Sequence, residues 1–287
     1  MSETQRSETW TSAAPFYFVA IHGGAGYHPP SSDSSNRRSL RAAVSSALST
    51  LTTVSISSSK SSSGSCNPTA LDTTTALIAA LEDSPEFNAG YGSNLTFDGD
   101  VECDAALMDG GASDGGYYAF GGVGAVRGVR NPVLLARCVL DGRCQQQRQG
   151  LGLGRVPPLL LVGDGAVRFA AERGVRAGGA VEGEPVEMIA PRARREWEVW
   201  RERWEQEEKR RTTSVTGGDS RDLAELRGVG FGANADLAML RARQDTVGAV
   251  VVRDDAGDVA AGVSRCVRCL CVFFLRRTSW SLTRRWF

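Results

Sequence analysis

The sequence predicts a single α/β domain that carries insertions, and three observations support this fold class. Its 287 residues are enough to bury a sizeable core. Apolar stretches of strand length alternate with segments whose apolar residues recur at helical spacing. Glycine-rich turns separate several of these segments, which is typical of alternating strands and helices.

The composition excludes several classes of protein. The formal net charge is zero, so no overall field attracts the chain to nucleic acid or to a membrane surface. The seven cysteines lack the regular spacing of a secreted disulfide framework, which favours a reducing compartment. Residues 1–15 have no signal-peptide pattern and are expected to be a disordered tail, and no apolar run approaches the roughly 20 residues of a membrane span. We therefore expect a cytoplasmic or nuclear protein with no nucleic-acid or membrane partner.

The first elements lie between residues 16 and 85. Residues 16–22 predict a buried strand that ends in a turn rich in glycine and proline. Residues 37–51 predict a helix, and the serine-rich residues 55–65 are expected to be a disordered low-complexity insertion. Asp72 is a suitable cap for a second helix, which ends before Pro85.

The middle of the chain begins with an acidic, glycine-rich segment, FNAGYGSNLTFDGDVECDAALMDG, at residues 87–110. Residues 101–110 and 120–128 predict short strands, and Pro132 fits the first turn of a helix over 131–142. Residues 157–174 predict a strand, a glycine turn and a helix. Asp104 and Asp109 receive no catalytic role, because a structural role in the loop explains them equally well.

Residues 191–244 are interpreted as a charged helix followed by a linker. Within residues 191–211, tryptophans at intervals of three and four (Trp197, Trp200, Trp204) predict a surface helix whose aromatic face packs on the body of the protein. Recognition of a partner or of nuclear import through residues 209–211 is the alternative. Residues 212–244 have the composition of an exposed linker, where chains are readily cut.

A β-hairpin is predicted directly after this linker. Residues 247–253 form one strand, residues 254–258 the turn, and residues 259–264 the returning strand. If the turn is centred on Asp255, Thr246 and Ser264 lie opposite each other, with Cβ atoms about 4.5–5.5 Å apart. The turn type can shift this register, and threonine–serine pairs are also common in hairpins without any function.

The chain offers no histidine base for such a hydroxyl. Its two histidines, His22 and His28, lie near the amino terminus, and no serine–histidine–aspartate arrangement is present. A threonine hydroxyl can instead be activated by its own α-amine after the chain is cut just before it. An α-amine has a pKa of about 7.7–8.0, which suits a general base at neutral pH. Self-cleavage between Asp245 and Thr246 is therefore a hypothesis that the residues themselves suggest.

Six motifs follow one another over roughly residues 16–264: IHGGAGYH (21–28), ALEDSPEFNAGYGSNL (80–95), GDVECDAALMDG (99–110), GGVGAVRGVRNPVLLAR (121–137), GRVPPLLLVGDGAVRFA (154–170) and DTVGAVVV (245–252). In this order they resemble the asparaginase-type N-terminal-nucleophile hydrolases, and within them the threonine aspartase (taspase) branch most. Asp245 before the threonine and the basic insertion before the cleavage site favour that branch.

The resemblance implies a four-layer αββα sandwich and a precursor that cuts itself. Residues 16–245 correspond to the α subunit, and residues 246–264 to the start of a β subunit whose nucleophile is Thr246. Ser264 matches the second hydroxyl that supports the nucleophile. Gly26 resembles a backbone position near the scissile bond, and Asn88 a side chain that helps to orient it. No metal or organic cofactor is implied, and the complete family form is expected to be a homodimer of processed heterodimers.

The resemblance ends after Ser264. Residues 265–287 do not continue the family pattern, so most of the β-subunit half is expected to be missing. A retained intron or a shifted reading frame explains this tail most simply, and a natural short isoform is the alternative.

The sequence thus predicts a threonine-type endopeptidase that cuts protein substrates after aspartate, with impaired activity in this truncated form. One alternative is an isoaspartyl peptidase or L-asparaginase. The other is a non-catalytic truncated homologue that pairs with an intact one.

Overall fold

The computed structural model describes residues 16–24, 30–58, 68–110, 118–149, 156–172, 188–216, 245–254 and 257–266. Their strands form one six-stranded sheet in the order β1-β5-β6-β2-β3-β4. All neighbours in this sheet are antiparallel except β3 and β4, which are parallel. The strands are β1 (Tyr17–His22), β2 (Glu102–Asp109), β3 (Ala119–Arg127), β4 (Leu160–Val162), β5 (Val247–Arg253) and β6 (Asp258–Cys266).

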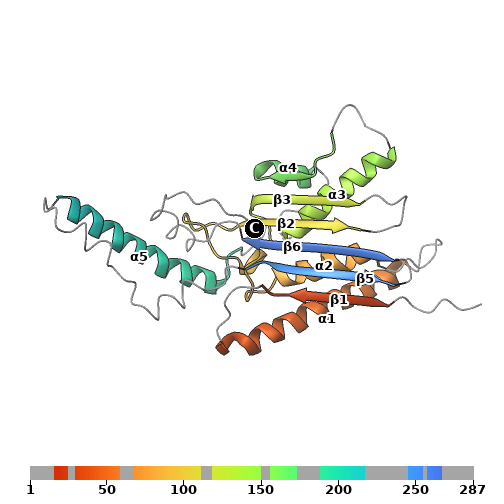
Figure 1. The fold of residues 1–287 in the computed structure, drawn as a ribbon, viewed down its shortest axis with the longest axis horizontal. Coiled ribbons are helices and arrows are strands. Elements are labelled where there is room, and N and C mark those ends of the chain that lie inside the picture. Colours follow the sequence, from red (N-terminus) through yellow and green to blue (C-terminus); the bar gives the residue numbers. More distant parts are fainter. Residues whose placement is uncertain are drawn as a thin grey trace, which may run out of the picture.

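Helices cover one face of this sheet, so the observed class is α/β (Figure 1). Helix α2 packs on β5 and β6, α3 packs on β2 and β3, and α1 packs against α2. The core lies between these helices and the sheet. The helices are α1 (Asp33–Ser58), α2 (Ala70–Glu82), α3 (Pro132–Gln149), α4 (Asp164–Ala171) and α5 (Pro191–Thr216), with two short 3-10 turns, η1 (Pro30–Ser32) and η2 (Gly90–Gly92).

Helix α2 is capped three residues earlier than predicted. Its N-cap is Thr69, whose hydroxyl accepts a hydrogen bond from the N–H of Asp72 at 3.0 Å. Asp72 lies at the third helical position, and its carboxylate accepts from the N–H of Thr69 at 3.0 Å. The prediction that Asp72 is the cap was therefore wrong, because this aspartate is the returning partner of a capping box.

Strand β1 is not buried as predicted. It lies at the edge of the sheet, and Phe18 is 65% exposed. An apolar run looks the same in sequence whether one face or both faces of a strand are covered. Only the position of the strand in the sheet decides between these cases.

The sheet face opposite the helices is apolar and uncovered among the described residues. Val250, Val263, Met108 and Phe120 are exposed there. Together with small residues of β5, β6 and β2, their side chains line a shallow apolar hollow. The described residues thus form one sheet with helices on one side, and they contain no second sheet of the predicted αββα sandwich.

Helix α5 extends from one end of the sheet (Figure 1). Its tryptophans contact the loop between α2 and β2, in agreement with the predicted surface helix whose aromatic face packs on the body. The indole of Trp197 donates to the carbonyl of Thr96 at 2.9 Å, and Trp204 contacts Phe97 edge to face. Arg192 binds the carbonyls of Pro85 and Gly92 in the same loop. The insertion therefore helps to hold the loop that carries Asn88.

Several segment predictions lie partly or wholly outside the described residues. The last turn of α1 extends into the segment 55–65, of which residues 59–65 are not described. Helix α5 continues to Thr216, and residues 217–244 are not described. Residues 1–15 and 267–287 are likewise outside, and β6 runs through Cys266. No helix of the described residues is long and apolar enough to cross a membrane.

Candidate active site

The predicted scissile bond lies at the start of β5, in the middle of the sheet. Asp245 is buried, and Thr246 is half-buried and directly precedes the first paired residue, Val247. Strand β5 is bonded to β1 on one side and to β6 on the other. The backbone after Thr246 is thus firmly held.

Asn88 donates a hydrogen bond to the carbonyl oxygen of Asp245, with 3.3 Å between Nδ2 and that oxygen. The Oδ1 atom of Asn88 accepts the backbone N–H of Asn94 at 2.9 Å. Because a backbone N–H can only donate, this contact fixes which end of the Asn88 amide faces Asp245. Its NH₂ group is therefore aimed at the carbonyl of the bond predicted to be cut.

A glycine turn lies against the other side of Asp245. Gly24 follows β1 and has φ +115°, a conformation that favours glycine. A Cβ atom at Gly24 would lie within the contact distance of the Asp245 carboxyl group. Gly26, the glycine singled out from the sequence, lies outside the described residues.

Ser264 does not lie directly opposite Thr246. It pairs with Val247, one residue further along, so the predicted register was wrong by one position. The loop between the paired residues Arg253 and Asp258 has an even number of residues, which places its centre between two residues instead of on Asp255. Ser264 still lies beside the start of β5, and its side chain is fully buried.

A buried carboxyl group, that of Glu82, lies near Ser264. Glu82, the last residue of α2, is 0% exposed, and its Oε1 accepts the N–H of Val133 at 3.1 Å. Its Oε2 and the Oγ of Ser264 have no hydrogen-bond partner within bonding geometry among the described residues. Burial raises the pKa of Glu82 to about 8, although nearby polar groups, first Ser264 and then Val133 and Asn131, lower it.

Glu102 and Asp104 of the predicted loop have structural partners in β3, and Glu102 pairs with Arg127. Asp104 accepts the backbone N–H of Ala125 at 3.0 Å, where β3 has a residue of positive φ. The described residues contain no group of three or more histidine, cysteine or acidic side chains that could hold a metal ion.

Sequence reasoning missed Glu82, Gly24 and Asn94. Glu82 stands beside a second acid at a helix end, a position that is usually exposed, so its burial carries no local signal. The glycines of the turn at 23–26 gave a usable signal, but their spacing does not show which of them packs on Asp245. Asn94 acts through its backbone N–H, which any residue except proline supplies.

The sequence model of the family described as asparaginase matches residues 15–266, and the chain belongs to this family. The family is a class of N-terminal-nucleophile hydrolases, and the α/β arrangement of the described residues is consistent with the fold of that class.

Curated relatives are similar to this chain over shorter stretches than the family model covers. The isoaspartyl peptidase/L-asparaginase of Rattus norvegicus is 42% identical over 106 residues, which are 37% of this chain and 26% of the relative. The Homo sapiens protein of the same name is 41% identical over 106 residues, or 37% and 29% of the two chains. The plant-type L-asparaginase of Thermococcus kodakarensis is 43% identical over 101 residues, or 35% and 27%. The matched part of this chain thus spans between a quarter and a third of each relative.

Proposed function

We propose that the chain is a threonine-type amidohydrolase of the isoaspartyl peptidase/L-asparaginase kind, which cuts its own bond between Asp245 and Thr246. The observation that carries this proposal is the hydrogen bond from Asn88 to the carbonyl oxygen of Asp245. A donor aimed at a carbonyl oxygen stabilises the negative charge that develops there when a nucleophile attacks. The names of the relatives support the choice of substrate class.

Self-cleavage follows from the groups at this bond. The hydroxyl oxygen of Thr246 attacks the carbonyl carbon of Asp245, and a C–O bond forms while the C–N bond breaks. The proton of the hydroxyl passes to the nitrogen, which leaves as a free α-amine. Water then hydrolyses the ester, so Asp245 becomes a new carboxyl terminus.

The processed threonine carries both nucleophile and base. Its α-amine takes the proton of its own hydroxyl while the oxygen attacks a substrate amide. The leaving amine takes that proton, and water releases the acyl group. Small compounds with a β-aspartyl or asparagine amide are the substrates of this proposal.

An endopeptidase that cuts after aspartate, as in the threonine aspartase branch, is the second candidate. Asp245 favours it, because its buried side chain packs against Gly24 on the acyl side of the scissile bond. Self-cleavage would itself be a cut after aspartate. A place that accepts this side chain in the precursor could accept the corresponding substrate residue after processing.

The four-layer sandwich is part of this proposal. The uncovered face of the sheet carries Val250, Val263, Met108 and Phe120, and its apolar character supports packing of a second sheet upon it. Face-to-face packing of two sheets is the ordinary way to bury such a surface.

Denaturing electrophoresis with mass spectrometry tests the proposal. The purified chain should yield fragments 1–245 and 246–287, and Thr246→Ala should stay intact. Asn88→Ala should slow the cut about 10²–10³-fold, the cost of losing one oxyanion donor. Asn36→Ala, which removes a buried asparagine amide from α1, is the matched control and should cut at the normal rate.

Activity is then compared on two substrates, a β-aspartyl dipeptide and a peptide with an internal aspartate. Preference for the first supports the isoaspartyl peptidase, and preference for the second the endopeptidase. A chain that stays whole and hydrolyses neither is the non-catalytic homologue.

A further inference from the structure

Helix α2 lies along β6 and is tied to it near its start by two hydrogen bonds. At its start, the N–H of Ala70 donates to the carboxylate of Asp258 at 2.8 Å. One turn later, the hydroxyl of Thr74 donates to the carbonyl of Ala260 at 3.4 Å. From Ala70 to Glu82 the helix rises about 18 Å, and from Asp258 to Ser264 the strand extends about 20 Å. These matched lengths bring Glu82 to Ser264.

Among the residues that the structure describes, Glu82 and Ser264 each leave one polar atom without a partner. Oε2 of Glu82 and Oγ of Ser264 are both buried, and Ser264 is close enough to act on the Glu82 carboxyl. A buried polar atom without a hydrogen bond costs about 1–3 kcal/mol. Two such atoms satisfy each other if one carries a proton that the other accepts.

The surroundings of Glu82 keep a proton on it. Burial is the largest effect and raises its pKa to about 8, and the neighbouring Asp83 raises it as well. Cys103 faces it from β2, and burial raises the pKa of that thiol so that it stays neutral. The nearby cation, Arg130, pairs with Asp83 at 2.8 Å. The N–H of Val133 in α3 donates to Glu82, and the amide of Asn131, just before α3, lowers the pKa of Glu82.

We infer that Glu82 is a positioning residue, which donates a hydrogen bond from Oε2 to Oγ of Ser264 and so orients that hydroxyl for the reaction at Thr246. Once Ser264 Oγ accepts this bond, its own hydrogen is free to act as a donor at the start of β5. This inference rests on the proposed function only for its last step. The pairing of Glu82 with Ser264 is a property of the fold and can be tested by itself.

A purely structural role for Glu82 makes different predictions. If Glu82 served only to accept the N–H of Val133 at the start of α3, its ionised form would be favoured, because a helix N-terminus stabilises negative charge. As a donor to Ser264 it must be protonated. Glu82→Gln keeps an acceptor for Val133 and a donor for Ser264 but cannot titrate, whereas Glu82→Met keeps the length and loses both.

Infrared spectroscopy of the whole chain at pH 7 tests the pairing without reference to activity. We expect the carbonyl band of a protonated carboxylic acid, its loss in Glu82→Gln, and a shift of the band in Ser264→Ala. Absence of this band at pH 7, or a band that Ser264→Ala does not move, overturns the inference.

The pH dependence of self-cleavage tests the positioning role. The new α-amine does not exist before the cut, so its titration does not affect this rate. The rate in the natural chain should fall relative to Glu82→Gln as the pH rises through about 8. Glu82→Met should cut roughly tenfold more slowly at pH 7, the factor that corresponds to one hydrogen bond.

The outcomes separate the two proposals. If the natural chain never cuts, the proposed function fails, and the infrared result still decides the pairing. If it cuts and Glu82→Gln follows the same pH profile, the positioning role is wrong. Should Glu82→Met not fold, the comparison of the natural chain with Glu82→Gln remains decisive.

Discussion

At the scale of single residues, the backbone around Asp245 is held from two sides. Asn88 donates to its carbonyl oxygen, and Gly24 lies against its side chain. Asn94 fixes the orientation of the Asn88 amide through a backbone N–H. The side chain of Asn88 and the missing side chain of Gly24 therefore both act on the residue before the scissile bond.

Gly24→Ala tests the close approach to Asp245. The substitution introduces strain at φ +115° and a clash with the carboxyl of Asp245. We expect self-cleavage to slow and the free energy of unfolding to fall by about 2–3 kcal/mol, measured by gel and by urea unfolding.

Gly128→Ala is the control for backbone strain alone. Gly128 also has a positive φ, +67°, but no atom of the described part of the chain lies within 4 Å of the place where its Cβ would be. This variant should lose about 1 kcal/mol and cut at the normal rate. Equal effects of the two substitutions on cleavage would show that the contact with Asp245 is unimportant.

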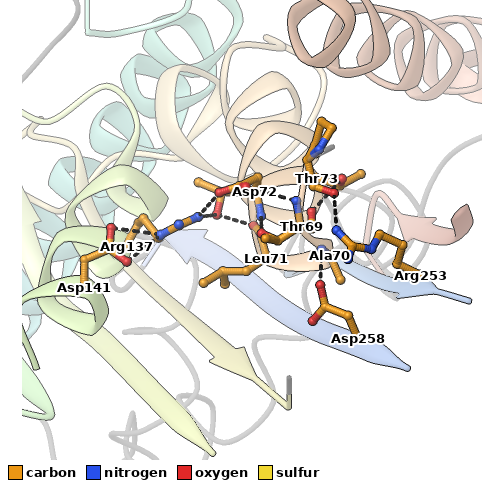
Figure 2. A network of polar contacts seen from close by, with 11 residues as sticks. Thr69, Ala70, Leu71, Asp72, Thr73, Arg137, Asp141, Arg253 and Asp258 are labelled. Carbon is orange, nitrogen blue, oxygen red and sulfur yellow. Dashed lines mark hydrogen bonds and ion pairs between the residues drawn. The ribbon is translucent and has the colours of Figure 1, made fainter. Parts of the chain in front are cut away.

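At the scale of elements, the start of α2 is a centre of polar contacts (Figure 2). Thr69 and Asp72 form the capping box, and Arg137 of α3 pairs with Asp72 at 2.9 Å and with Asp141 at 2.9 Å. Asp258 adds a carboxylate to the first amide of the helix. Because these bonds join α2 to α3 and to β6, they fix the helix that carries Glu82 at its other end.

Asp72→Asn tests this network through the pH dependence of the free energy of unfolding. Burial raises the pKa of Asp72, but hydrogen bonds from Thr69 and the charge of Arg137 outweigh it, so the pKa is below the ordinary value of 3.8. A lowered pKa in the folded state stabilises the protein above pH 3.8, and this stabilisation is lost as the pH falls below that value.

The variant should therefore lose about 1–2 kcal/mol at pH 7 in urea unfolding, and the difference from the natural chain should shrink below pH 4. Asp33→Asn removes an exposed ion pair with Arg37 and should cost less than about 0.5 kcal/mol. A constant difference across the acid range would contradict the lowered pKa.

At the scale of the whole molecule, the sheet has two unlike faces. The face under α2 and α3 is buried, while the opposite face exposes apolar side chains of β5, β6, β2 and β3. Adjacent residues of β5 show the contrast, since Val250 is 45% exposed and Val251 is fully buried. An apolar face of this extent favours association with another layer.

Val250→Asp and Val251→Asp form a matched pair that tests this contrast. We expect Val250→Asp to change the free energy of unfolding by less than about 1 kcal/mol and to weaken the binding of an apolar dye. Val251→Asp places a charge in the core and should cost more than about 3 kcal/mol. Similar losses in both variants would mean that the exposed face is covered in solution.

Much of the fold could be predicted from local patterns. The strands at 17–22, 102–109, 247–253 and 258–266 and the helices that begin near residues 70, 132 and 191 follow from apolar periodicity and turn residues. The predicted site residues Asn88 and Asp245 lie in contact, because the glycine-rich loop that carries Asn88 returns to the start of β5. Whether Thr246 is the nucleophile stays a prediction.

The sequence by itself determined the elements and the chemical types at the site, because periodicity, turns and caps are properties of neighbouring residues. Only the tertiary structure decided that Ser264 pairs with Val247, that Glu82 lies buried beneath it and that β1 is an edge strand. Register depends on the length of the hairpin loop, and burial depends on which distant element covers a side chain. The residues of the loop allow more than one turn and so more than one register, and no local stretch shows which distant element covers a side chain.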